Sequence, residues 1–357
     1  MPSESVIKRR ILQHYVLLRR GLILSVVVGL LAIVLIFFLP LFRLGKEVLF
    51  GPVNVFSVVF QRPSELKSDA GQTNILLLGI GGPEHDGPNL TDTMIVASFK
   101  LPIDDKTASA TPAVNLISLP RDIYLDSLGG KINTAYAVGF EKGPDVGLVM
   151  AKATVSEVTG LPIHYVVVVD FSVFEKIVDI VGGVDVTVER EFTDKEYPLD
   201  GKENDQCGGD PEFKCRYETI QFSAGFQHMD GATALKFVRS RHADGDEGTD
   251  FARAKRQQLV LAALKAKLFS GNLLLSPSRI LEIYNQLKTH INTDLSPNEA
   301  NQIINVALKF RQAQFKNVVL GLDQLENPPI DDRGWILTPK GGDWSVVHDF
   351  VKSTLQE

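Results

Sequence analysis

The sequence predicts an α/β domain with a central mixed β-sheet flanked by helices on both faces, preceded by one transmembrane helix. After residue 71, short apolar runs rich in Val and Ile alternate with segments of helical spacing, as in a sheet covered on both faces. An uncharged apolar run at 21–42 precedes them. The chain has 357 residues, of which 44% are hydrophobic and 22% charged, and its net charge is −6. This composition excludes a disordered protein and a general nucleic-acid binder.

The run "GLILSVVVGLLAIVLIFFLPLF", residues 21–42, is expected to cross a membrane. At a rise of about 1.5 Å per residue its helix would span roughly 33 Å, which matches the hydrocarbon core of a bilayer. A cleaved signal peptide would be shorter and would end at a small-residue site, which "LFRLGKEVLF" does not offer. Basic residues gather on the N-terminal flank: Lys8, Arg9, Arg10, Arg19 and Arg20. The positive-inside rule therefore places residues 1–20 in the cytoplasm as a basic tail, and residues 43–357 outside.

Residues 43–70 are expected to connect this helix to one extracytoplasmic domain at 71–357, because no strong linker follows residue 71. The predicted strands are 74–80, 93–99, 113–119 and 163–171, and the predicted helices are 144–160, 230–238, 250–270, 277–288 and 296–313. Residues 172–188 predict a helix, a Gly-Gly turn and a strand. The tail 334–355 predicts a closing strand and a helix.

The two cysteines, Cys207 and Cys215, lie in the polar segment "DQCGGDPEFKCRY". Outside the cytoplasm such a pair favours a disulfide, which in the chain-entropy model contributes about 2–3 kcal/mol. A zinc site is the alternative, but it would need two further ligands. We interpret the pair as a structural disulfide.

The stretch "KFVRSRHADGDEGTDFARAKRQQ", residues 236–258, holds six Lys or Arg and four acids. In a helix over 250–270, Asp250, Arg253 and Gln257 would share one face. If the preceding segment is extended, Arg239 and Arg241 would point the same way. Converging arginines suit phosphate oxygens. A solvated face with local Arg–Asp pairs is the alternative, and spacing alone leaves both open.

A second polar cluster follows a predicted strand end. Arg121 and Asp122 come directly after strand 113–119, where α/β sheets commonly bind ligands. Asp92 precedes strand 93–99 and could either cap a turn or hold a hard cation such as Mg²⁺. The segment "GIGG" at 79–82 is a weak phosphate-loop signal.

The order of these motifs resembles the LytR-CpsA-Psr family of bacterial cell-envelope proteins. The matching segments are "NILLLGI", "LTDTMIVASF", "ISLPRDIYL", "KINTAYAVG", "DFSVFEKIVDIVGGVDVTV", "GFQHMDGATALKFVRSR" and "DFARAKRQQ", which lie in this order within residues 74–258. The resemblance implies a phosphotransferase that takes a glycopolymer from a polyprenyl-pyrophosphate carrier. It would attach the polymer to the C6 hydroxyl of N-acetylmuramic acid in peptidoglycan and release polyprenyl phosphate.

The resemblance also implies roles for particular residues. The expected pyrophosphate-binding residues are Arg121, Arg239, Arg241, Asp250, Arg253 and Gln257. Among these, Gln257 is expected to add a polar contact, and Asp250 is expected to orient the arginines. Asp92 is the expected Mg²⁺ ligand, and Asp92, Arg121, Arg239 and Arg241 are the expected catalytic residues.

Two positions depart from the family pattern. Many members carry Gly-Ser-Asp after the first strand, where this chain has Gly79, Ile80 and Gly81. Many also carry Arg two residues before the matched Asp, where this chain has Leu90. Asp86 is a candidate replacement for the missing carboxylate, although an unrelated surface turn is the better explanation of this residue. The departures affect the expected metal and phosphate contacts.

Two other functions stay open at this point. The same residues would serve a hydrolase that cleaves the polyprenyl-linked pyrophosphate with water, or a non-catalytic binder of lipid carriers that regulates the envelope. Regulation by direct DNA contact is not expected, because a basic tail of about 20 residues is too short for a helix-turn-helix.

Overall fold

The computed structural model describes residues 66–356, apart from positions 84, 86, 101–112, 203, 275 and 310–312. The predicted cytoplasmic tail, the apolar run 21–42, nearly all of the connector and Asp86 lie outside these residues. Of the helices that are described, none is both long and apolar enough to cross a membrane. The predicted anchor and domain boundaries therefore stay predictions.

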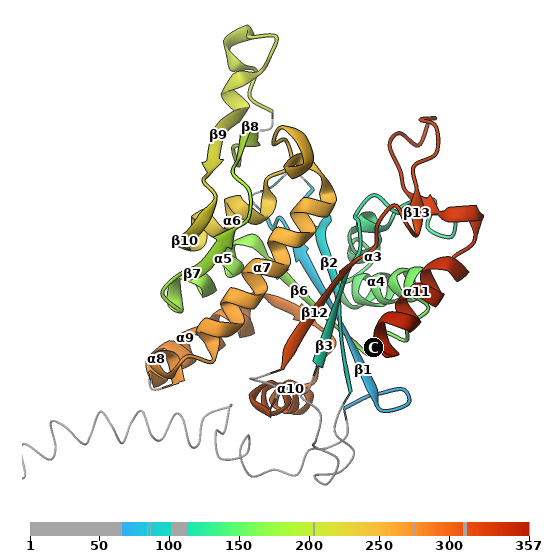
Figure 1. The fold of residues 1–357 in the computed structure, drawn as a ribbon, viewed down its shortest axis with the longest axis vertical. Helices are drawn as coiled ribbons and strands as arrows, with labels where there is room; N and C mark the ends of the chain where they lie inside the picture. Colours follow the sequence, from blue (N-terminus) through green and yellow to red (C-terminus); the bar gives the residue numbers. More distant parts are fainter. Residues whose placement is uncertain are drawn as a thin grey trace, which may run out of the picture. The chain divides into compact units, whose positions relative to one another are not determined.

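In the described part of the chain, six strands form the central sheet in the order β11-β6-β1-β2-β3-β12 (Figure 1). Their bounds are β1 Gln72–Ile80, β2 Thr91–Lys100, β3 Ala113–Ser118, β6 Tyr165–Asp170, β11 Ile291–Thr293 and β12 Gln314–Val319. β1 and β3 both pair antiparallel with β2, whereas β1–β6 and β3–β12 are parallel. The predicted mixed sheet is confirmed.

Helices cover both faces of this sheet. On one side are α3 Ala135–Phe140, α4 Pro144–Thr159 and α11 Ser345–Gln356; on the other are α5 Phe171–Ile180, α6 Gly231–Arg239, α7 Asp250–Leu268 and α9 Pro277–His290, with the short α8 Gly271–Leu274 between α7 and α9 (Figure 1). Because strand side chains alternate, Leu76 and Leu78 pack in the core cluster that holds α3, α4 and α11. Ile75 packs in a smaller cluster with α10 Pro297–Lys309.

The helix boundaries follow from capping residues. α4 begins with Pro144 and ends at Gly160, whose φ of 69° is the left-handed conformation that glycine adopts readily. The N-cap Asp170 of α5 accepts a hydrogen bond from the backbone nitrogen of Val173 at 2.9 Å. These helices, together with α6, α7, α9 and α10, lie where the sequence predicts them.

The tail departs from its prediction. Its helix forms as α11, but its strand is only β14 Thr338–Pro339, which pairs with β13 Leu325–Glu326 outside the central sheet. The sheet is closed instead by β12, which the sequence reasoning missed. The remaining two-stranded sheets are β4 Tyr124–Leu125 with β5 Gly130–Lys131, β7 Val184–Val188 with β10 Gly225–Met229, and β8 with β9.

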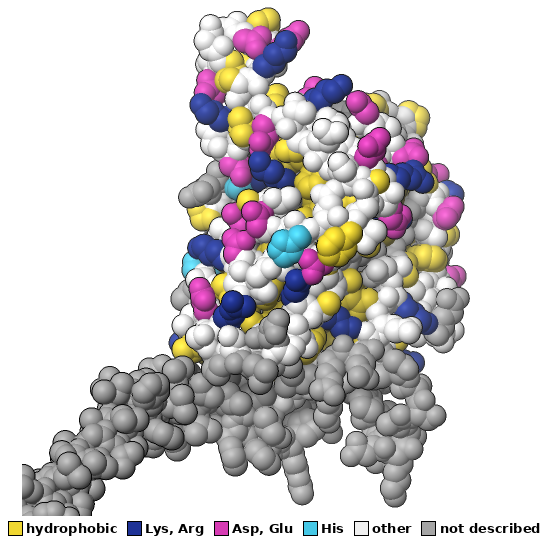
Figure 2. Space-filling view, turned by 60° about the vertical axis from the view of Figure 1, so that its left-hand side comes forward, with side chains coloured by type: hydrophobic (Ala, Val, Ile, Leu, Met, Phe, Trp, Pro, Cys, Tyr) yellow, Lys and Arg dark blue, Asp and Glu magenta, His cyan; other side chains and the backbone are white. Residues whose placement is uncertain are grey.

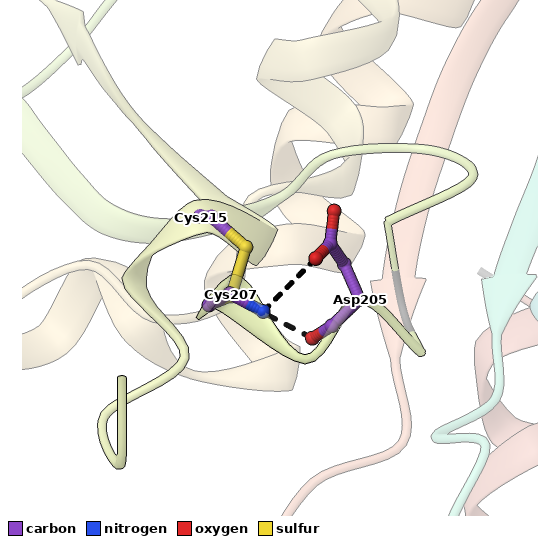
Figure 3. Close-up of side chains that lie close together, drawn as sticks. All are labelled: Asp205, Cys207 and Cys215. Carbon is purple, nitrogen blue, oxygen red and sulfur yellow. Dashed lines mark hydrogen bonds between the residues drawn. A yellow bond between two sulfur atoms is a disulfide. The ribbon is translucent and has the colours of Figure 1, made fainter. Parts of the chain in front are cut away.

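A projecting arm, residues 192–222, is formed by β8 Phe192–Pro198, β9 Tyr217–Phe222 and the segment between them. It stands out at the top of Figures 1 and 2, where Figure 2 shows side chains of both charges on its surface. Cys207 and Cys215 are joined in a disulfide with a Cα–Cα distance of 5.5 Å. The backbone nitrogen of Cys207 donates to the Asp205 carboxylate at 2.9 Å (Figure 3). The predicted disulfide is confirmed, and with both sulfurs bonded to each other the zinc alternative is wrong.

Candidate functional site

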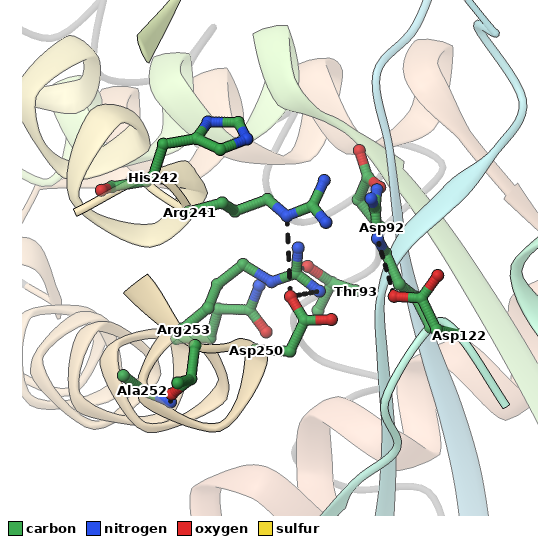
Figure 4. Close-up of polar contacts among 12 residues, drawn as sticks. Asp92, Thr93, Asp122, Arg241, His242, Asp250, Ala252 and Arg253 are labelled. Carbon is green, nitrogen blue, oxygen red and sulfur yellow. Dashed lines mark hydrogen bonds and ion pairs between the residues drawn. The ribbon is translucent and has the colours of Figure 1, made fainter. Parts of the chain in front are cut away.

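The charged stretch 236–258 and strand β2 meet around one pocket of about 100 Å³. Its walls include five of the side chains that the sequence singled out, namely Asp92, Arg239, Arg241, Arg253 and Gln257. Figure 4 shows that the side chains of Arg241, Asp250 and Arg253 gather between α7 and the sheet, opposite Asp92 and Asp122. The structure thus brings together the two clusters that sequence spacing could only treat separately.

Helix α7 presents the predicted face to this pocket. The N-cap Thr249 accepts a hydrogen bond from the backbone nitrogen of Ala252, which starts the helix beside the pocket. The Nη2 atom of Arg253 lies 3.2 Å from Oδ1 of Asp250. One further turn along, Gln257 donates through Nε2 to the hydroxyl of Thr93 on β2, at 2.8 Å. Thr93 was not among the predicted site residues.

Arg239 and Arg241 reach the pocket from different backbone conformations. Arg239 is the last residue of α6, so the expectation that both arginines lie in one extended segment is wrong. The turn after the helix is fixed by Asp194, whose Oδ2 accepts hydrogen bonds from the Ser240 hydroxyl at 2.7 Å and from the Arg241 backbone nitrogen at 3.1 Å. Burial alone would raise the pKa of Asp194, but these hydrogen bonds outweigh it and lower the pKa. An ionised buried Asp194 therefore aims the Arg241 segment.

The second cluster is tied to the first through Asp92. Arg121, three residues after β3, donates to the Asp92 carboxylate on β2. Asp92 is the second residue of β2, not a residue before the strand. The Asp122 carboxylate contacts two neighbouring basic side chains. One of its oxygens lies 2.6 Å from Nζ of Lys131, and the other lies 3.6 Å from Nε of Arg121.

The arginines of the site are buried and incompletely paired. Only 6% of the Arg253 side chain and 20% of the Arg121 side chain are exposed, which excludes a solvated face. Three nitrogens have no hydrogen-bond partner within the described residues: Nε of Arg121, Nε of Arg241 and Nη1 of Arg253. Since a buried donor without a partner is unfavourable, the pocket is suited to a ligand with several acceptor oxygens.

The pKa shifts reflect the same crowding of positive charge. Burial lowers the pKa of Arg253 to about 10, although Asp250 opposes the shift. Burial and the neighbouring Arg121 also lower the pKa of Arg241. Burial would raise the pKa of Asp250, but Arg253 and Arg241 outweigh it, so the carboxylate has a lowered pKa. At neutral pH all three groups are charged, and an added anion would be attracted.

Both departures from the family pattern are accommodated by neighbouring side chains. A Cβ atom at Gly81 would lie 2.7 Å from Cβ of His85, so His85 fills the space that a side chain at position 81 would need. In the same loop, Leu90 packs against Gly87, where an added Cβ would lie 2.6 Å from Cδ1 of Leu90. The loop is therefore built around His85 and Leu90.

Asp92 is the side chain of this pocket that suits a hard cation. Among the described residues, three potential metal ligands come within 4.8 Å of one another only at Asp205, Cys207 and Cys215, and there the cysteines are bonded to each other. Mg²⁺ commonly takes one or two carboxylates and completes its shell with water and substrate phosphate oxygens. One carboxylate beside a pocket lined by arginines fits that pattern.

Comparison with known proteins gives concordant results. The model of the LytR_cpsA_psr family matches residues 55–325. The chain is 32% identical over 235 residues to the polyisoprenyl-teichoic acid–peptidoglycan teichoic acid transferase TagU of Bacillus cereus (strain AH820), with 64% of each chain covered. It is 27% identical over 293 residues to the TagU protein of Enterococcus faecalis, with 79% of this chain and 82% of that protein covered. The crystal structure of B. subtilis TagV shares the fold, with a TM-score of 0.52 at 24% identity over 81% of this chain and 99% of that one.

Proposed function

The chain belongs to the LytR-CpsA-Psr family, and on this premise we propose that it transfers a glycopolymer from a polyprenyl-pyrophosphate carrier to the C6 hydroxyl of N-acetylmuramic acid in peptidoglycan. The B. cereus and E. faecalis relatives are named as teichoic acid transferases, which makes a teichoic acid precursor the first donor to test. The chain spans 64% of the length of the B. cereus relative.

The observation that carries the proposal is the set of unpaired guanidinium nitrogens around the pocket. Arg121, Arg241 and Arg253 each have a buried nitrogen without a hydrogen-bond partner within the part of the chain that the structure describes. A pyrophosphate offers several oxygens to such donors, and the planar guanidinium matches them in pairs. Arg241 and Arg253 share the single carboxylate of Asp250, so a bound anion would also offset the remaining positive charge of this pair.

In the proposed reaction one P–O bond forms, another P–O bond breaks, and the acceptor hydroxyl loses its proton. The acceptor hydroxyl oxygen attacks the phosphorus atom that carries the glycan, and the bond from this phosphorus to the bridging oxygen breaks. The electron pair leaves with polyprenyl phosphate, and the hydroxyl proton is lost to solvent. Such a step needs positioning and charge stabilisation more than covalent participation by the protein.

In this proposal Arg121, Arg239, Arg241 and Arg253 bind the pyrophosphate, and Gln257 adds a polar contact. Asp250 orients two of the arginines, since its Oδ1 atom lies 3.2 Å from Arg253 Nη2 and 3.6 Å from Arg241 Nε.

Asp92 would hold Mg²⁺, with Arg121 fixing the orientation of its carboxylate. When bound, the ion would offset negative charge on the phosphates.

The proposed location follows from residues 1–42. The uncharged run 21–42 would anchor the chain in the cell membrane as a single span, with the basic tail inside. The domain would then work outside the cytoplasmic membrane, where it would meet both the lipid carrier and peptidoglycan. Protease accessibility of the domain in intact cells tests this part of the proposal, and protection of the domain would contradict it.

The transfer assay uses the full chain in detergent micelles with a polyprenyl-pyrophosphate-linked teichoic acid precursor and peptidoglycan oligomers, with and without Mg²⁺. We expect mass spectrometry to detect a phosphodiester-linked product and polyprenyl phosphate, both lost in Arg241→Met. Arg190→Met is the matched control, because Arg190 is 66% exposed and pairs with the exposed Asp246. Glycan phosphate without linkage would indicate the hydrolase instead, and lipid binding without turnover would indicate a non-catalytic binder.

A further inference from the structure

Arg239 differs from the other arginines of the pocket in having a carboxylate partner from a distant part of the fold. Its Nη1 atom lies 3.2 Å and 3.3 Å from the two carboxylate oxygens of Asp200, and its Nη2 atom lies 3.2 Å from Oδ1. The guanidinium also stacks on the rings of Phe171 at 4.7 Å and Tyr197 at 5.6 Å. Only 14% of the Arg239 side chain is exposed. These contacts therefore fix the orientation of the Arg239 guanidinium before any ligand binds.

Asp200 is carried by the projecting arm, just after β8. The residue before it, Leu199, donates its backbone N–H to the carbonyl of Arg216 at 2.8 Å. Arg216 directly follows Cys215 of the disulfide, and its Nε donates to the carbonyl of Asp205 at 2.8 Å. The segment before Asp200 is thus linked to the disulfide by a short series of bonds, which ends one residue before Asp200.

His85 also contacts the Asp200 carboxylate. Nε2 of His85 lies 3.0 Å from Oδ1 of Asp200, and the His85 ring packs edge-on against Phe171 at 5.5 Å. Burial would raise the pKa of Asp200, but the neighbouring His85 and Arg239 side chains lower it to about 2. The carboxylate is therefore ionised at any pH at which the protein would work.

We propose that Asp200 is a positioning residue for the phosphate-binding pocket, acting through Arg239. A guanidinium has five N–H donors, and Asp200 accepts from only two of the three nitrogens. Arg239 lines the pocket, so it can keep the Asp200 contact and still offer donors to a ligand phosphate. The proposal rests on the proposed function only in its requirement for a phosphate-binding pocket. It does not depend on whether the bound pyrophosphate is then transferred or hydrolysed.

A second interpretation of the contact between Asp200 and Arg239 predicts the opposite effect on phosphate binding. If Asp200 occupied the place of a ligand phosphate, its carboxylate would compete with the ligand for Arg239. Removing its charge would then strengthen phosphate binding. If Asp200 positions Arg239, the same change weakens binding, because the guanidinium is free to turn away from the pocket.

The test measures binding of inorganic pyrophosphate to the full chain by titration calorimetry. We expect Asp200→Asn to weaken binding about tenfold, the effect of losing an orienting hydrogen bond between charged groups. Asp200→Glu, which keeps the charge, should restore part of the affinity. Asp210→Asn is the matched control: it removes the same charge from the same arm, and its carboxylate accepts only from the backbone nitrogens of Glu212 and Lys214 among the contacts described.

A double-mutant cycle separates positioning from a general effect on the fold. If Asp200 acts through Arg239, Asp200→Asn has no further effect on pyrophosphate binding in the Arg239→Met background. An equal loss in both backgrounds, unchanged binding, or tighter binding in Asp200→Asn would each overturn the proposal. Absence of pyrophosphate binding by the unsubstituted chain would overturn both this proposal and the proposed function. Normal binding without transfer would overturn the proposed function alone.

Discussion

Replacing Arg253 by Met should separate ligand binding from stability at the candidate site. Burial lowers the pKa of this guanidinium by more than two units, to about 10, despite the opposing effect of Asp250. One pKa unit corresponds to about 1.4 kcal/mol, so keeping this group charged destabilises the fold by up to about 3 kcal/mol. The attraction to Asp250 is already contained in that figure, because it contributes to the pKa.

The size of this destabilisation depends on pH. Below about pH 10 the guanidinium is charged in both the folded and the unfolded chain, so the destabilisation is fully present at neutral pH. It would weaken only as the pH rises above about 10, where the folded chain begins to lose this proton. A neutral side chain of similar length removes it at every pH.

We therefore expect Arg253→Met to raise the free energy of unfolding by up to about 3 kcal/mol. The same variant should weaken pyrophosphate binding by about 10- to 100-fold, because a charged donor to the ligand is lost. Urea denaturation of the full chain measures the first quantity, and titration calorimetry with inorganic pyrophosphate measures the second.

Arg256 provides the matched control, one turn further along α7. Its guanidinium donates to the backbone carbonyls of Phe237 at 2.9 Å and Ser240 at 2.6 Å, and to the Glu247 carboxylate at 2.9 Å. Burial lowers the pKa of Arg256 as it does that of Arg253, but Arg256→Met also leaves these acceptors without a donor. The free energy of unfolding should therefore fall by about 2–4 kcal/mol. If Arg253→Met destabilises the protein as much as Arg256→Met does, both arginines are structural and the reasoning is refuted.

The pKa of Asp200, about 2 against an ordinary 3.8, means that its stabilising effect is fully present above about pH 4 and is lost as the pH falls towards 2. Stability measured from about pH 5 downwards should fall less steeply in Asp200→Asn, and parallel curves would contradict this. Replacing Cys207 and Cys215 together by Ser should destabilise the arm by about 2–3 kcal/mol, with faster amide hydrogen exchange within 199–217; unchanged exchange there would refute it. Gly81→Asp should destabilise the fold by about 1–3 kcal/mol through its clash with the Cβ atom of His85, and His85→Gly in the same chain, which removes that atom, should recover stability in urea unfolding. Failure of that rescue would show that other contacts exclude a side chain at position 81.

The apolar runs of the central strands made the inner part of the sheet predictable from the sequence. The edge strands lack such runs, and the sequence did not predict them. β1 and β2 are buried over most of their length and carry the apolar runs Ile75–Leu78 and Met94–Ala97 at their centres. β12 is nowhere fully buried and contains Gln314, Lys316 and Asn317, and β11 has only the residues Ile291–Thr293. A half-exposed edge strand needs fewer apolar residues, and its pattern resembles a loop.

The site was predictable only as far as it lies on one element. The spacing of Asp250, Arg253 and Gln257 on α7 follows from helix geometry alone. The contact between Asp92 and Arg121 depends on β2 and β3 being antiparallel neighbours, so that the start of one lies beside the end of the other. Spacing could not provide that pairing. Asp200 gave no sequence signal, because its role arises from a hairpin that folds back onto α6.

The strand order also has a consequence for how the chain folds. The inner strands β6, β1, β2 and β3 all come from residues 72–170, whereas both outermost strands come from residues 291–319. Until the later segment is made, β6 and β3 expose open edges that can pair with other molecules. A fragment ending at residue 258 would contain every candidate site residue and would nevertheless be expected to aggregate, and a monomeric fragment 66–258 would contradict this. We therefore expect the C-terminal segment to determine the yield of soluble protein, although it contributes no side chain to the proposed chemistry.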